Sequence, residues 1–312
     1  MAATITASQY KERYENVWVP MDDGRSVTVS VNKYRLNNSA FHNPAYGEAF
    51  VRTLARRGID MDLRIDTLGG THRVDLRLNQ HADMAKKGKQ DLVLSTPGLG
   101  KNDRRFDTRI TDWTKLAKYA FAGKGSPEAS QIVLQLAVHW GLTTNPQEYA
   151  DAALGTDCNG FVGNYIWHVL RGNEWYKIGV ANNELGPDSP IKSGFYDHYK
   201  KNLVRRWEDL DNNRMYIMMR TDDDGNVINQ GSGENVAHIV ITEPGGRQDR
   251  PDSGLNPFAV TAVESTAGAV LPGLSESYYT CKGMLVPLVF KIYREAMKAG
   301  HRDKNFMIAA VT

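Results

Sequence analysis

The sequence predicts an α+β protein in which a β-rich N-terminal region is followed by helices and then by antiparallel strands. Before about residue 110, hydrophobic residues alternate with a period of two, which is typical of half-buried strands. After that point they recur with the helical period of about 3.6, and strand-like segments return in the C-terminal third. Helices and strands are therefore segregated along the chain, as they are in α+β folds.

Short strands dominate the predicted N-terminal region, residues 1–110. Alternating hydrophobic residues mark three of them, at 27–31, 61–65 and 74–78. A Gly69-Gly70 turn separates the last two, and a helix is expected over Tyr46–Arg57. Residues 84–105 are rich in glycine, lysine and arginine and lack a clear period. We therefore expect an exposed connection there and a domain boundary just after it.

Residues 111–312 form the second predicted domain, which begins with helices. Ser126-Pro127-Glu128 is a strong helix start, because serine caps the first turn and proline suits its first position. A further helix begins at Cys158 and ends near Arg171-Gly172. The polar stretch at about 173–235 is interpreted as an insertion. Strands are then expected in the C-terminal part of the domain, at 215–219, 236–242, 258–265, 288–293 and 306–311.

Composition and charge exclude several classes of protein. The 312 residues include 38 Lys or Arg and 36 Asp or Glu, a net charge of +2, so no strong field attracts nucleic acid or an anionic membrane. No apolar run reaches the length of about 18 residues that a transmembrane helix needs. The N-terminus lacks the basic and apolar regions of a signal peptide. We therefore expect a protein that is made in the cytoplasm.

The segment with the clearest chemical meaning is Thr156-Asp157-Cys158-Asn159-Gly160, at the start of an amphipathic helix. Unpaired N–H groups and the positive end of the helix dipole stabilise a thiolate at such a position. The same N–H groups can receive an oxyanion, which makes Cys158 a candidate nucleophile. Gly160 and Gly163 indicate tight packing against this helix. The alternative is that Cys158 is a small buried hydrophobic residue.

A thiolate nucleophile needs a base, and His238 in the expected strand 236–242 is the strongest candidate. Alternate side chains of this strand share a face, and we expect the face of His238 to meet the cysteine helix. A core histidine without a catalytic role is the alternative. Glu264 stands at the end of an apolar row on the next strand and is the candidate that orients the imidazole. Gln248 and Asp249 are its rivals.

Asp157-Cys158-Asn159-Gly160-Phe161-Val162, followed by a histidine at the head of a strand, resembles the NlpC-type papain-like cysteine peptidases and amidases. Their hallmark is Asp-Cys-Ser-Gly-Phe/Leu-Val at the start of a helix. The resemblance covers about residues 111–312 and implies a papain-like domain in which helices pack on an antiparallel sheet. It also implies Cys158 as the nucleophile, His238 as the general base and then acid, and Glu264 as the orienting residue.

The chain departs from this family pattern at several points. Asn159 stands where the family has serine, and the aromatic and glycine pattern that usually precedes the cysteine is absent. Tyr149 is then the candidate for a tyrosine on the substrate side, and Asp157 and Asn159 are further candidates at the oxyanion or substrate. Residues 1–110 show no such resemblance, and we expect them to serve delivery, targeting or wall binding.

The resemblance implies hydrolysis of amide bonds in bacterial peptidoglycan through a thioester acyl-enzyme, without a cofactor or a metal. The expected partners are the peptidoglycan peptide and an immunity or inhibitor protein, and not nucleic acid. The expected settings are a toxin effector, exported by a non-classical secretion system and acting in the periplasm of a target cell, or a phage lysin. The alternatives are an acyltransferase or deamidase acting on a protein or lipid, and a non-catalytic structural or binding protein.

Overall fold

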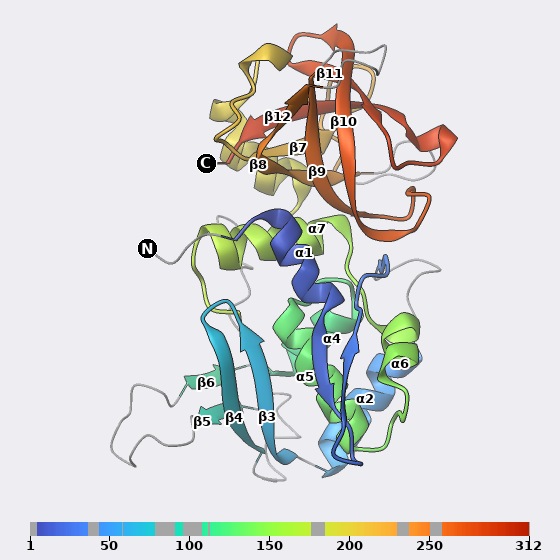
Figure 1. Ribbon diagram of the computed structural model, residues 1–312. Helices are drawn as coiled ribbons and strands as arrows, with labels where there is room; N and C mark the ends of the chain where they lie inside the picture. Colours follow the sequence, from blue (N-terminus) through green and yellow to red (C-terminus); the bar gives the residue numbers. More distant parts are fainter. Residues whose placement is uncertain are drawn as a thin grey trace.

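The computed structural model describes residues 5–36, 44–57, 59–78, 91–95, 108–111, 113–175, 185–229, 237–249 and 258–311. Figure 1 shows two halves, with helices and small sheets below and a barrel of strands above. Helices α1 (Ala7–Glu15) and α7 (Cys158–Asn164) lie between the two halves. Within the described ranges, no helix combines the length and the apolar character that crossing a membrane would require.

The lower half comes from the first half of the chain. Its elements are β1 (Val17–Pro20), β2 (Ser26–Val29), α2 (Pro44–Arg57), β3 (Ile59–Thr67), β4 (Gly70–Leu78), β5 (Asp91–Ser95), β6 (Thr108–Thr111), α4 (Trp113–Phe121), α5 (Pro127–His139) and α6 (Pro146–Ala153). Strands β1 and β2 form a hairpin, and β3 to β6 form an antiparallel sheet. Helix α5 is buried along nearly its whole length, so it forms the centre of this half.

Local sequence signals correctly predicted several of these elements. The side chain of Ser126 caps α5, and β3 and β4 pair as the alternating pattern indicated. The helix expected over Tyr46–Arg57 is α2. Of the connection expected at 84–105, only Asp91–Ser95 lies within the described residues, and it forms strand β5 rather than an irregular segment.

The upper half shows that the predicted papain-like fold, with helices packed on an antiparallel sheet, is wrong. Its strands are β7 (Tyr216–Arg220), β8 (Ile239–Asp249), β9 (Phe258–Thr266), β10 (Gly273–Val286), β11 (Val289–Arg294) and β12 (Asp303–Ala310). They close into an antiparallel barrel in the order β10-β11-β12-β7-β8-β9. The sequence indicated all of these strands except β10. Because β10 pairs with β9 along one edge and with β11 along the other, it closes the sheet.

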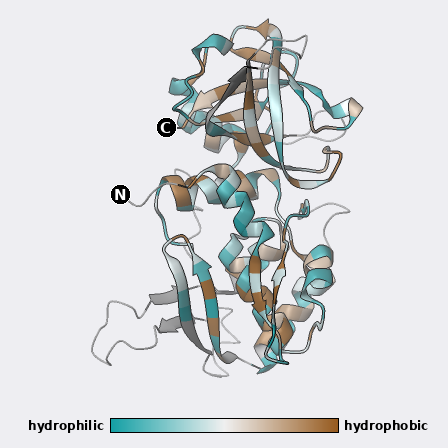
Figure 2. Cartoon of the chain, in the orientation of Figure 1, coloured by the Kyte–Doolittle hydropathy of each residue, from teal (hydrophilic) through white to brown (hydrophobic). Residues whose placement is uncertain are grey.

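The sequence of β10 does not show the regular alternation that identifies a strand. Its pairing with β11 shifts register between Cys281 and Gly283, and again between Met284 and Val286. Each such irregularity breaks the alternation of buried and exposed side chains by which a strand is recognised. The interior of the barrel is nevertheless continuous, and hydrophobic segments follow its strands in Figure 2. Its core includes Met218, Val240, Val260, Ala262, Tyr279, Phe290, Ile292, Phe306 and Ile308.

Helix α7 packs between the outside of the barrel and α1. Phe161 belongs to one buried cluster with Ile239 and Ile241 of β8, and its ring lies 5.9 Å from the ring of Tyr10 in α1. The chain continues from α7 into a π-helical segment that runs to Leu170. The helix therefore ends immediately before Arg171, as the sequence predicted.

The two glycines of α7 lie where other chain segments approach its backbone. A Cβ atom at Gly160 would lie 1.9 Å from the carbonyl oxygen of Gly123, and one at Gly163 would lie 2.4 Å from that of Gly186. Neither position has room for a side chain. The tight packing that these glycines indicated is thus confirmed.

We expect Gly160→Ala to lower the free energy of unfolding by about 1–3 kcal/mol, because the new methyl group must push the helix away from the Gly123 backbone. Thermal and urea denaturation followed by circular dichroism measure this loss. Gly300→Ala is the matched control, since a Cβ there meets nothing within 4 Å. Equal stabilities of the two variants would contradict the close approach at Gly160.

Candidate active site

Cys158 is the first residue of α7, as the sequence predicted. Asp157 is the N-cap residue, and its carboxylate accepts a hydrogen bond of 2.6 Å from the N–H group of Gly160. The N–H groups of Cys158 and Asn159 belong to the first turn and have no acceptor within the helix. The cysteine therefore lies at the positive end of the helix, where a negative charge is stabilised.

His238 and Glu264 are joined by a short hydrogen bond at one end of the barrel. Nε2 of His238 donates to Oε2 of Glu264 at 2.5 Å. The carboxylate can only accept, so this contact places a proton on Nε2. Gln248 and Asp249, the rivals for the third position, lie at the opposite end of β8 from His238. Of these three residues, the structure thus brings Glu264 to the imidazole.

Glu264 is a completely buried carboxylate with further partners on two other strands. The hydroxyl of Tyr279 donates to Oε1 at 2.6 Å, and Nη1 of Arg294 lies 3.4 Å from Oε2. Burial alone would raise the pKa of Glu264. The charge of Arg294 and the hydrogen bonds with His238 and Tyr279 hold that pKa below its ordinary value instead. The group is therefore a charged carboxylate.

Cys158 lies close enough to His238 for the sulfur to raise the pKa of the imidazole. Nε2 is bound to Glu264, which leaves Nδ1 as the ring nitrogen that can exchange a proton with another group. Burial by itself would lower the pKa of His238. The interaction with Cys158, together with the hydrogen bond and the charge of Glu264, outweighs burial and raises the pKa from 6.5 to about 9. The imidazole thus holds its proton between two acidic groups at neutral pH.

We expected the face of the strand that carries His238 to meet the cysteine helix, and this expectation is wrong. Ile239 and Ile241 of β8 pack with α7, whereas Val240 points into the barrel interior. His238 precedes the first residue of β8, so it lies at the mouth of the barrel. It meets Cys158 there because the cysteine is at the end of its helix and not in the middle.

Tyr34 lies beside Cys158, and sequence analysis did not find it. Burial raises the pKa of Tyr34, and the nearby charges of Cys158 and Asp157 raise it further. The backbone around Tyr34 forms a parallel bridge with Thr156: the Thr156 N–H donates to the carbonyl of Lys33 at 2.9 Å. The segment lies far upstream in the chain, and no motif marks it. The N-terminal part of the chain therefore contributes to this site.

Asp157 and Asn159 hold the start of α7 in place. Asp157 forms an ion pair of 2.7 Å with Lys124, although burial still keeps the pKa of its carboxyl above the ordinary value. The side-chain amide of Asn159 donates to the carbonyl of Ser189 at 3.0 Å, and its oxygen lies 3.9 Å from the sulfur of Cys158. Both candidates thus adjoin the cysteine.

Tyr149, the candidate for the substrate-side tyrosine, is not part of this group. It lies in α6, and its ring makes an edge contact with Tyr46 at 5.3 Å within the core of the lower half. Cys158 belongs to a different buried cluster, between α7 and the barrel. Tyr34, whose pKa the charge of Cys158 raises, is a tyrosine of the described residues that lies near the sulfur.

The sequence also did not indicate Tyr279 and Arg294 as residues of the site. They are directly opposite each other in the pairing of β10 with β11, which places both beside Glu264. Tyr279 lies on the strand that the sequence did not reveal. Arg294 looked like an ordinary basic residue at a strand end, although its side chain is only 4% exposed. The available signal was the carboxylate of Glu264 at the end of an apolar row, because such a group needs a cation nearby when it is buried.

In comparisons with known proteins, no family model, curated protein or solved structure matches the chain. The chemistry must therefore be argued from the site. Among the described residues, no group of three His, Cys, Asp or Glu side chains is placed to hold a metal ion. What the site does contain is a thiol at a helix start, an imidazole near it and a buried carboxylate hydrogen-bonded to the imidazole. Such an arrangement suits nucleophilic catalysis by sulfur.

We expect iodoacetamide to alkylate Cys158 at pH 6 at least about tenfold faster than Cys281, because the thiolate is the reactive form. Cys158 stands at the start of α7 and beside His238, whereas burial raises the pKa of the Cys281 thiol. Peptide mass spectrometry measures both rates. His238→Ala should slow only the labelling of Cys158. Equal rates at the two cysteines, or no effect of His238→Ala, would contradict the contact.

We expect the ring of His238 to remain protonated at neutral pH and to lose its proton as the pH rises through about 9. In Glu264→Gln, the neutral amide no longer balances the imidazolium, so the midpoint should fall toward 6.5. Titration of the ring by NMR measures both midpoints, with His198 as an internal reference outside the site. A wild-type midpoint near 6.5 would mean that the ring is not held between the two acidic partners.

Proposed function

We propose that the chain is a cysteine-dependent amide hydrolase. The observation that carries the proposal is the contact chain from Cys158 through His238 to Glu264. Its members come from α7, from the start of β8 and from β9, and they meet at one end of the barrel. Arg294 and Tyr279 support the charge of Glu264 together with His238, so the carboxylate stays charged beside the imidazole. A role in orienting the ring of His238 for catalysis accounts for the contact.

In the proposed reaction, His238 holds the proton of the Cys158 thiol while the sulfur attacks the amide carbonyl carbon, and the C=O electron pair moves to the oxygen. The first-turn N–H groups of α7 are placed to stabilise this oxyanion. The intermediate collapses to a thioester as the C–N bond breaks, and His238 gives its proton to the leaving amine. Water, deprotonated by His238, then attacks the thioester. Its hydrolysis releases the acid and restores the thiol.

The proposed substrate is the peptide part of bacterial peptidoglycan. The resemblance of Asp157-Cys158-Asn159-Gly160-Phe161-Val162 to NlpC-type enzymes supports this choice, because those enzymes cleave cell-wall peptides. A toxin effector or a phage lysin is the setting that we propose for such an activity. The segment around Tyr34 adjoins Cys158, so the N-terminal part of the chain would shape the substrate site as well as any role in delivery or wall binding.

We expect Cys158→Ala to reduce the release of amino groups from purified peptidoglycan by more than about 10³-fold, because no other group can form the acyl-enzyme. Amine-reactive dye and mass analysis of the fragments measure the release. Cys281→Ala is the matched control and should retain activity, since that thiol belongs to the buried cluster of the barrel and not to the cluster of Cys158.

The same assay separates the proposal from its alternatives. Activity that survives Cys158→Ala would contradict the mechanism. If Cys158 is readily alkylated but peptidoglycan is untouched, the substrate is wrong, and transfer or deamidation on proteins or lipids should be assayed with the same variants. If Cys158 is neither alkylated nor needed for any reaction, the chain is a structural or binding protein.

A further inference from the structure

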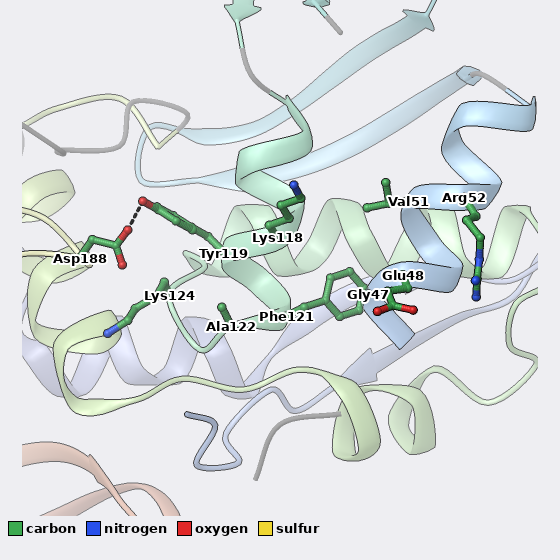
Figure 3. Close-up of a pocket in the computed structure, with 10 residues that line it drawn as sticks. All are labelled: Gly47, Glu48, Val51, Arg52, Lys118, Tyr119, Phe121, Ala122, Lys124 and Asp188. Atoms are coloured by element: carbon green, nitrogen blue, oxygen red, sulfur yellow. Dashed lines mark hydrogen bonds between the residues drawn. The ribbon is translucent and has the colours of Figure 1, made fainter. Parts of the chain in front are cut away.

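A cavity of about 630 Å³ lies between α2 and α4, apart from the residues of the catalytic contact chain. Its volume falls within the range of about 300–1,000 Å³ that is typical of ligand sites. Figure 3 shows side chains from both helices lining it, together with Lys124 and Asp188 at one end. None of these residues belonged to a motif, so the cavity was not visible in the sequence.

The floor of the cavity is apolar and rigid. Phe121 lines it from α4, and the ring is only 3% exposed because it packs against Phe50 at 5.4 Å in the core of the lower half. Gly47 of α2 faces the same ring, and a Cβ there would lie 3.3 Å from it. Val51 and Ala122 complete the apolar surface. The floor therefore suits the apolar part of a ligand.

Charged groups of both signs surround this floor. Lys118 of α4 and Arg52 and Glu48 of α2 line the cavity and are exposed. At the end shown on the left of Figure 3, Asp188 accepts a hydrogen bond from the hydroxyl of Tyr119. A purely anionic ligand would meet the carboxylates of Glu48 and Asp188, and a purely cationic one would meet Lys118 and Arg52. The lining is complementary to a ligand that carries both an amine and carboxylates.

One end of the cavity is tied to the residues on either side of Cys158. Lys124, which lines the cavity, holds Asp157 by an ion pair of 2.7 Å. Asp188 lines the same end, and the next residue, Ser189, accepts the hydrogen bond from the Asn159 side chain at 3.0 Å. A ligand in the cavity would therefore reach the segment that carries the nucleophile.

We propose that this cavity is a subsite for a short amphoteric peptide, the part of the peptidoglycan stem that flanks the cleaved bond. Its apolar portion lies over Phe121, its amine lies toward Asp188, and its carboxylates lie toward Lys118 and Arg52. This inference rests on the proposed function, because the occupant is a part of the proposed substrate. Lys124 is a positioning residue in this arrangement, since its charge is held by Asp157.

Calorimetric titration of the Cys158→Ala protein with the tripeptide L-Ala-γ-D-Glu-meso-diaminopimelate tests the subsite without turnover. Val51→Trp, which fills the cavity, and Lys118→Glu, which reverses one charge at its rim, should each weaken binding at least about tenfold. Lys291→Glu is the matched control, because Lys291 is an exposed lysine on barrel strand β11 and should leave binding unchanged. Circular dichroism melting checks that each variant folds. If Val51→Trp does not fold, Lys118→Glu alone still tests the proposal.

The outcomes separate this inference from the proposed function. One possible outcome is that both cavity variants weaken binding of the tripeptide while the wild-type chain cleaves no peptidoglycan. This outcome would support the subsite and overturn the proposed hydrolysis. Cleavage that depends on Cys158 but whose KM is unchanged by Lys118→Glu and Val51→Trp would overturn the subsite and leave the hydrolysis standing. Absence of binding at millimolar tripeptide, or equal binding by all variants, would also overturn the subsite.

Discussion

The buried carboxylate of Glu264 is the constraint on which the rest of the site depends. A charge inside a barrel of apolar side chains is destabilising by several kcal/mol unless it is paired and hydrogen-bonded. Glu264 is fully buried, and it meets this requirement through Tyr279, Arg294 and His238. Two of these partners come from β10 and β11. Closure of the barrel is therefore a condition for the charge that orients His238, and fold and chemistry cannot be separated here.

The site is also assembled from both halves of the molecule. The segment at Lys33–Arg35 pairs with the backbone that leads into α7. Asn32, just before it, accepts a hydrogen bond of 2.7 Å from the N–H group of Leu274 in β10. On the barrel side, the hydroxyl of Ser265 donates to the carbonyl of Thr156 at 2.5 Å. The start of the cysteine helix is thus held between an N-terminal strand segment and the barrel, and Cys158 is placed by contacts from both.

Whether the role of a residue could be predicted from the sequence depends on how far away in the chain its interaction partners are. Ser126 and Asp157 cap helices through bonds within three residues, so their roles are visible in a short stretch of sequence. Cys158, His238 and Glu264 could be named from a helix start and from strand patterns, and the structure brings them together. Tyr34 could not be named, since its place beside the sulfur depends on pairing between distant segments.

By itself, the sequence determined where most helices and strands form and that a cysteine begins a helix, because capping and hydrophobic periodicity act over a few residues. Tertiary structure alone decided that the sheet closes into a barrel, because β10 gains its strand character by pairing with β9 and β11 and not from its own alternation. It also decided which strand face meets α7 and which cation neutralises Glu264. Those choices depend on residues that are distant in the chain and meet only when the barrel is formed.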